Sequence, residues 1–95
     1  MKQYIVVLIT DYDGNVDVDV KPFKSFNNAK AYLHEAYLDA KLNMSSMGIE
    51  VTYDRVTNTK EDDENDYYES IDFFVEGEDD NYWVSGEIKT EKVEE

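Results

Sequence analysis

Apolar and polar residues alternate most clearly in the segment 16–20, where every second residue is valine and the residues between are acidic. This period of two predicts a strand with one wet face. The preceding segment, 4–12, is β-branched and aromatic and predicts another strand. Asp13-Gly14 between them is typical of a tight hairpin turn. The hairpin would place six aliphatic side chains on one side of the sheet: Ile5, Val7, Ile9, Val16, Val18 and Val20.

The first predicted strand is apolar on its other side as well, through Tyr4, Val6 and Leu8. A strand that is apolar on both sides is typically buried on both. We therefore expect this strand to be central in its sheet, or to have its second face covered by a partner.

A helix is predicted from Phe26 to about Met44, after a break at 21–24. Ser25 is the expected N-cap, because its hydroxyl can accept a free backbone N–H of the first turn. Gly48 is expected to end the segment in a turn. One apolar stripe at helical spacing consists of Phe26, Ala29, Leu33, Ala36, Tyr37, Ala40 and Met44.

Three further strands are predicted at 49–54, 67–76 and 82–88. Ile71, Phe73 and Val75 share one face of the second of these. The polar segment 58–66 is expected to be an acidic loop, and 90–95 a frayed tail. The order ββαβββ predicts a single α+β domain over residues 1–95, with an antiparallel sheet of about five strands and one helix on one face.

Composition narrows the classes of function. The 95 residues include 23 acidic and 9 basic ones, for a formal net charge of −14, and no cysteine. Such a charge disfavours direct binding of nucleic acid or of an anionic membrane. Disulfides and cysteine-based metal sites are excluded. The apolar run 4–9 is too short for a signal peptide or a bilayer span, so a cytoplasmic protein is expected.

The charge is distributed unevenly along the chain. Residues 1–49 hold 6 acidic and 5 basic residues, whereas residues 50–95 hold 17 acidic and 4 basic ones. The segment 61–80 alone contains 11 acidic residues and no basic one. Because aromatic residues are interspersed there, we expect this segment to fold and to hold its carboxylates on a structured surface.

Candidate catalytic and metal-binding motifs are weak. The segment 11–17 resembles the first half of an EF-hand calcium loop, but Val16 stands where glycine is needed and Pro22 where glutamate is needed. A hairpin with solvated carboxylates is the favoured interpretation. His34 lacks a partner pattern for acid–base catalysis, and no nucleophile or phosphate-loop motif is present. We therefore expect no enzyme activity, no cofactor and no metal site.

Aromatic residues cluster beside the acidic segment: Tyr67, Tyr68, Phe73, Phe74, Tyr82 and Trp83. Half of them are expected in the core. The other half, Tyr68, Phe74 and Trp83, would be exposed, either as anchors of a protein interface or beneath a dimer mate or a loop.

Small size, acidic bias, eight lysines to one arginine and a compact α/β layout resemble the small inhibitors of bacteriophages and mobile elements, in particular anti-CRISPR and anti-restriction DNA mimics. The resemblance implies a non-enzymatic inhibitor that occupies the basic nucleic-acid-binding surface of a host protein. The alternative is a soluble domain that forms a homodimer through its second sheet face, with charge for solubility only. The expected partner-binding residues are Glu61, Asp62, Asp63, Glu64, Asp66, Glu76, Glu78, Asp79 and Asp80.

Overall fold

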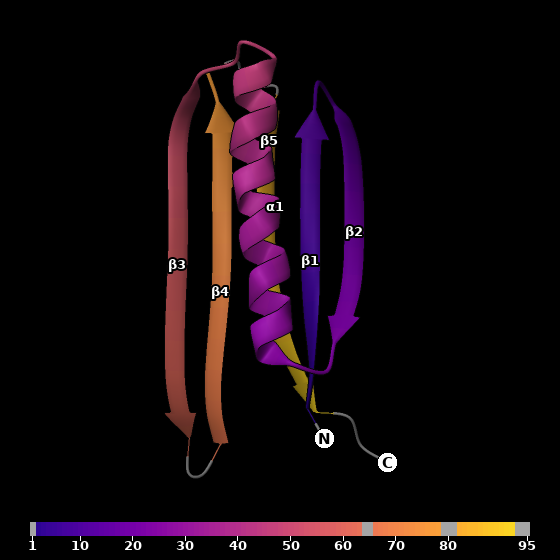
Figure 1. Cartoon of the computed structure of the whole chain (residues 1–95), viewed down its shortest axis with the longest axis vertical. Coiled ribbons are helices and arrows are strands. Elements are labelled where there is room, and N and C mark those ends of the chain that lie inside the picture. Colours follow the sequence, from indigo (N-terminus) through magenta and orange to yellow (C-terminus); the bar gives the residue numbers. More distant parts are fainter. Residues whose placement is uncertain (1, 64–65, 79–81, 93–95) are drawn as a thin grey trace.

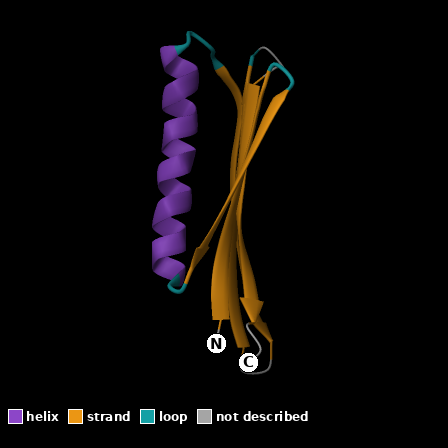
Figure 2. Cartoon of the chain, turned by 90° about the vertical axis from the view of Figure 1, so that its right-hand side faces the viewer, coloured by secondary structure: helices purple, strands orange, loops and turns teal. Residues whose placement is uncertain are grey.

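A computed structural model of the chain describes residues 2–63, 66–78 and 82–92, with the side chains of 60–63, 66–69 and 92 left out. Its elements are β1 (Lys2–Tyr12), β2 (Asn15–Phe23), α1 (Phe26–Ser46), β3 (Val51–Asp63), β4 (Asp66–Gly77) and β5 (Tyr82–Lys92). The five strands form one antiparallel sheet in the order β2-β1-β5-β4-β3. The α+β fold predicted from the sequence is therefore confirmed, with α1 lying along one face of the sheet (Figures 1 and 2).

The β1–β2 hairpin has the predicted register. Asp13 and Gly14 both have positive φ, at 51° and 86°, which is the conformation of the two-residue turns that match strand twist. Ile9 lies opposite Val18 and Val7 opposite Val20. The six aliphatic residues therefore share one face, and β1 lies inside the sheet between β2 and β5, as its two apolar sides indicated.

The helix begins at the predicted cap. The backbone N–H of Asn28 donates to the Ser25 hydroxyl at 3.3 Å, which satisfies one of the free donors of the first turn. At the other end, Gly48 has a φ of 76° and allows the chain to turn toward β3. The predicted stripe faces the sheet, with Ala29, Leu33, Ala40 and Met44 all buried.

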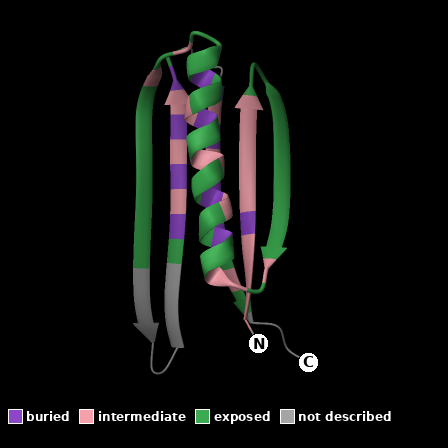
Figure 3. Ribbon diagram, in the orientation of Figure 1, coloured by how far each residue is buried: buried purple, intermediate pink, exposed green. Residues whose placement is uncertain are grey.

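The core lies between α1 and the middle strands. Alternate residues of β4 and β5 are buried, which produces the banding of β4 in Figure 3. Gly86 allows the closest approach, because a Cβ there would lie 2.8 Å from both Leu8 and Leu33 and against the ring of Phe73. The buried apolar side chains of the sheet are Val6, Ile71, Phe73, Val75, Tyr82, Val84 and Ile88.

Three sequence-based boundaries were wrong. Most of the expected loop at 58–66 belongs to strands, because β3 continues to Asp63 and β4 begins at Asp66. The expected tail at 90–95 is strand as far as Lys92, which pairs with Lys2. The expected break at 21–24 is strand as far as Phe23, since β2 is an edge strand and an edge tolerates Pro22.

Candidate interaction surface

The face of the sheet opposite α1 carries no covering element in the described part of the chain (Figure 2). We call it the open face. Strand alternation and register assign its residues, because they alternate with the buried ones and pair across neighbouring strands. The open face consists of Val16, Val18 and Val20 on β2, Ile5, Val7, Ile9 and Asp11 on β1, Trp83, Ser85, Glu87 and Lys89 on β5, Asp72, Phe74 and Glu76 on β4, and Tyr53, Arg55 and Thr57 on β3.

One half of the open face is aliphatic. The three valines of β2 are 57, 60 and 58 % exposed, and the three aliphatic residues of β1 beside them are partly exposed. Single exposed apolar residues are ordinary on protein surfaces, but a contiguous patch of six is typical of a contact surface.

An aromatic cluster lies at the end of the open face nearest the β1–β2 turn. The rings of Phe74 and Trp83 stack with centroids 5.8 Å apart, and Tyr53 meets Phe74 edge-on at 5.9 Å. Phe74 and Trp83 are half-buried and Tyr53 is 49 % exposed. Phe74 and Trp83 were expected to be exposed; they lie on the face away from the helix but are half-buried, because their rings stack on each other. The side chain of Tyr68 lies outside the described residues.

Two carboxylates lie directly opposite each other at the centre of the open face. Asp72 of β4 pairs in register with Glu87 of β5. Like charges at such a position destabilise a sheet. Each carboxylate has its own cation, with Arg55 Nη2 3.6 Å from Asp72 Oδ2 and Lys89 Nζ 3.6 Å from Glu87 Oε1. These four side chains are between 43 and 59 % exposed, so the two ion pairs are weak.

A hollow of about 220 Å³ lies between the aliphatic half and this carboxylate pair. It exists because β5 carries the small residue Ser85 on this face, where the paired residues of the neighbouring strands, Ile9 and Phe74, are large. One wall is aliphatic, and the other combines an aromatic ring with charged groups. Its lining includes Val7, Ile9, Phe74, Asp72 and Glu87. Sequence alternation could have placed these residues on one face, but it could not supply the strand order that brings them together.

The structure does not bring the predicted partner-binding residues into one patch. Glu61, Asp62 and Asp63 end β3, where they pair in register with Tyr68, Tyr67 and Asp66. Glu76 and Glu78 lie at the opposite end of β4, and the backbone N–H of Glu78 donates to Glu50 O at 2.8 Å. The eleven residues from Asp66 to Glu76 span about 33 Å. Glu64, Asp79 and Asp80 lie outside the described residues, as do the side chains of Glu61, Asp62, Asp63 and Asp66.

The acidic half of the sequence is nevertheless one continuous part of the sheet. Residues 50–95 supply β5, β4 and β3, which are adjacent in the strand order, whereas the nearly neutral residues 1–49 supply β2, β1 and the helix. The asymmetry of charge along the chain is therefore also an asymmetry in space.

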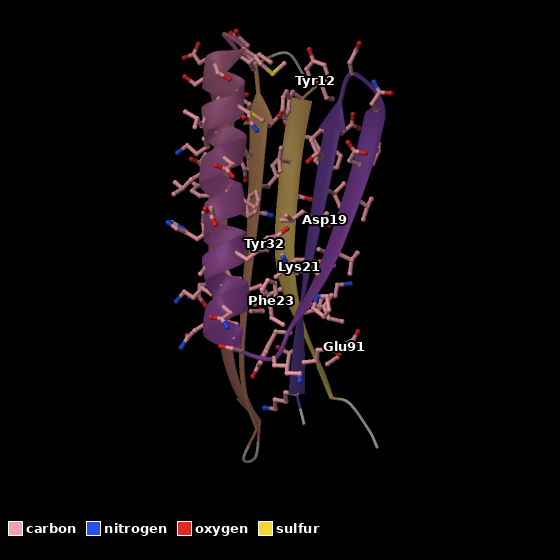
Figure 4. The ribbon with its side chains drawn as sticks, turned by 45° about the vertical axis from the view of Figure 1, so that its right-hand side comes forward. Tyr12, Asp19, Lys21, Phe23, Tyr32 and Glu91 are labelled. Carbon is pink, nitrogen blue, oxygen red and sulfur yellow. The ribbon has the colours of Figure 1, made fainter. Side chains whose placement is uncertain are left out.

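On the covered side, two tyrosines join the helix to the two edge strands. The Tyr32 hydroxyl donates to Asp19 Oδ2 on β2 at 2.9 Å, and Lys21 Nζ lies 4.9 Å from the Tyr32 ring centroid (Figure 4). The hydrogen bond to Asp19, together with partial burial, raises the pKa of the Tyr32 hydroxyl.

The second of these contacts is on β3. The Tyr37 hydroxyl donates to Asp54 Oδ1 at 2.7 Å, and Lys41 Nζ lies 2.9 Å from Asp54 Oδ2. Hydrogen bonds from Lys41 and Tyr37 lower the pKa of the Asp54 carboxyl. Sequence reasoning had assigned Tyr37 to the apolar stripe alone and missed its polar contact, which depends on the position of β3.

The calcium-loop resemblance of residues 11–17 has a structural explanation. Asp11 Oδ1 accepts the backbone N–H of Gly14 at 3.1 Å, so this carboxylate stabilises the hairpin turn. Among the described side chains, no three His, Cys, Asp or Glu residues form a group that could hold a metal ion. His34 is exposed on α1 and its ring lies 6.4 Å from that of Tyr37.

Within the described residues there is no helix with both the length and the apolar character needed to cross a bilayer. No protein-family model and no curated protein sequence matches the chain. The surface of the sheet is therefore the basis on which a function can be proposed.

Proposed function

We propose that the chain is a non-enzymatic acidic binding protein that occupies a basic, nucleic-acid-binding surface of a host protein, in the manner of a DNA mimic. One observation carries the proposal: the segment 50–95, with 17 acidic and 4 basic residues, supplies three adjacent strands of one sheet. A paired strand fixes the spacing of the residues along it at about 3.3 Å per residue. An acidic array on a rigid support suits a basic groove better than a disordered acidic tail does.

The separation of the two acidic groups along β4 is compatible with this role. Their distance of about 33 Å equals about ten base pairs of B-DNA, whose strands carry one phosphate per 3.4 Å. Asp72 and Glu87 lie between the two groups and continue the negative charge along the sheet. The extended shape of the molecule, 46 Å in its longest dimension, leaves room for such a contact.

A direct test is capture of the partner followed by competition with DNA. Tagged protein would be incubated with bacterial lysate at low salt, and the bound proteins would be challenged with duplex DNA. We expect DNA to displace the captured protein and high salt to release it, because both act on the same charges. A protein that stays bound under both challenges would contradict the proposal.

Charge reversal identifies the residues responsible. Changing Asp62, Asp63, Asp79 and Asp80 to lysine should abolish capture, because the partner's basic surface would then meet like charge. Loss of binding counts only if circular dichroism shows the variant folded. A folded variant that still captures the same protein would place the contact elsewhere.

The alternative function, a homodimer with charge for solubility only, is favoured by the exposed valines of β2. The two functions respond differently to salt. A dimer held by apolar contacts survives or strengthens at high salt, whereas binding of a basic partner weakens. Sedimentation equilibrium at both salt concentrations therefore separates them.

A further inference from the structure

The open face combines an aliphatic half, an aromatic cluster and a central carboxylate pair, and folding of the chain leaves all three uncovered in the described structure. We propose that it docks a basic partner through an arginine side chain that enters the hollow between β1, β5 and β4. This inference rests on the proposed function, since it names the chemistry by which a basic partner would be recognised.

A second copy of the chain fits this face poorly. The aliphatic half covers about 10 Å by 20 Å, an area of roughly 200–400 Å², against about 800 Å² per partner in a stable interface. Overlap of the whole face would reach that size, but it would bury Asp72 and Glu87 of both copies against each other. Removing these carboxylates and their long ion pairs from water at the centre of an interface would cost more free energy than the aliphatic contacts contribute.

Charge complementarity favours a cationic occupant instead. Among the described side chains, four carboxylates belong to the open face, those of Asp11, Asp72, Glu76 and Glu87, and Glu91 continues the same side of β5, against two cations, Arg55 and Lys89. Both cations make long, half-exposed ion pairs of 3.6 Å. An incoming cation can replace such pairs at little cost, because exposed ion pairs contribute little.

The lining of the hollow favours arginine over lysine. Val7 and Ile9 on one wall suit the methylene groups of a long side chain. Asp72 and Glu87 come from neighbouring strands, so two carboxylates border the hollow. Arg55 also lines it, and the incoming head group would replace the long ion pair of Arg55 with Asp72. A guanidinium group offers five donors in a plane and stacks on aromatic rings such as Phe74, whereas an ammonium group offers three donors from one point.

The aliphatic and aromatic parts would then contact apolar side chains beside that arginine. Tyr53 and Trp83 are the residue types that most often anchor interfaces, and they lie in register on either side of Glu76. The three valines of β2 extend the contact to the edge of the sheet. The partner is therefore expected to present arginine next to aliphatic residues.

The test compares nona-arginine and nona-lysine as probes in titrations followed by ¹⁵N NMR. The two peptides carry equal charge, so a difference between their affinities would reflect how the head groups fit the hollow and not the number of charges. We expect nona-arginine to bind at least about threefold tighter and to shift the amide signals of Val7, Ser85 and Gly86. Equal affinities, or shifts confined to α1, would overturn the inference.

Two variants and one matched control sharpen the result. Ser85→Val fills the hollow without changing charge, so it should remove the preference for arginine. Asp72→Asn with Glu87→Gln should weaken nona-arginine binding more than Glu35→Gln with Asp39→Asn, a control on α1 that removes the same two charges. Equal weakening by the two pairs, or an unchanged preference in folded Ser85→Val, would overturn the inference.

The outcomes separate this inference from the proposed function. Salt-sensitive binding of both peptides with equal affinity would reject the arginine site and leave the acidic binding function intact. Failure of both peptides to bind at low salt would count against both. A salt-resistant dimer whose interface maps to the valines of β2 would also reject the arginine site, because a second copy would then occupy the open face.

Discussion

The two faces of the sheet are formed by the same five strands but differ in residue composition. On the face beneath α1, the buried positions of the middle strands carry apolar residues or glycine, and Gly86 is required because any side chain there meets Leu8, Leu33 and Phe73. On the open face, the aliphatic rows stop at β1, and the next strand carries Glu87 and Lys89. Folding explains the composition of the covered face. The mixed composition of the open face is what a contact with another molecule would require.

The largest effect on the free energy of unfolding should come from a cavity created beneath the helix. Leu33 is 2 % exposed, so Leu33→Ala should lower the free energy of unfolding by about 2–5 kcal/mol. Leu38 lies on the outer side of the same helix and is 50 % exposed, so Leu38→Ala should change it by less than about 0.5 kcal/mol. Urea unfolding of both variants measures the difference, and similar losses would show that the assigned helix face is wrong.

The same substitution, valine to threonine, can be made on each face of the sheet to compare its effect on stability. Val6 is fully buried, and Val6→Thr should cost about 1–3 kcal/mol because the hydroxyl finds no water. Val18 is 60 % exposed, and Val18→Thr should stay within about 0.5 kcal/mol of the wild type. Thermal unfolding at low protein concentration is the measurement. A large loss for Val18→Thr would mean that the open face is already covered in the isolated protein.

The smallest effect concerns the contact between α1 and β3. Because hydrogen bonds from Lys41 and Tyr37 lower the pKa of Asp54, its contribution to stability is fully present above the ordinary aspartate pKa and is lost as the pH falls from there through the lowered pKa of the folded state. Asp54→Asn should therefore be slightly less stable than the wild type at pH 7, by less than about 1 kcal/mol, and the difference should shrink as the pH falls below the ordinary aspartate pKa. Urea midpoints over a series of falling pH values test this, and a difference that does not shrink would assign the effect to packing.

The sequence predicted those elements that carry an apolar alternation, a cap or a turn signal. Val16, Val18 and Val20 alternate with acidic residues although their side chains are exposed, Ser25 caps the helix, and Asp13-Gly14 turns the chain as expected. Sequence pattern failed at residues 58–63, where the strand is held by backbone pairing with β4 and has no apolar alternation to reveal it. Periodicity detects an apolar face, and this part of an edge strand has none.

The candidate site was only partly predictable for the same reason. The acidic excess of the second half could be counted directly, but the distance between its two ends depends on the length of β4. The opposition of Asp72 and Glu87, and the hollow beside them, depend on the register of β4 with β5. Strand order and register arise from long-range pairing, which local pattern does not specify.

The central claim is that the carboxylates of the second half form the binding surface, and affinity for the captured partner tests it most directly. The measurement compares Asp62→Lys with Asp63→Lys against Asp17→Lys with Asp39→Lys, two double variants of equal net charge. We expect the first pair to lose at least about tenfold in affinity and the second to stay near the wild type. Equal losses would show that only total charge matters, and would contradict the proposed function.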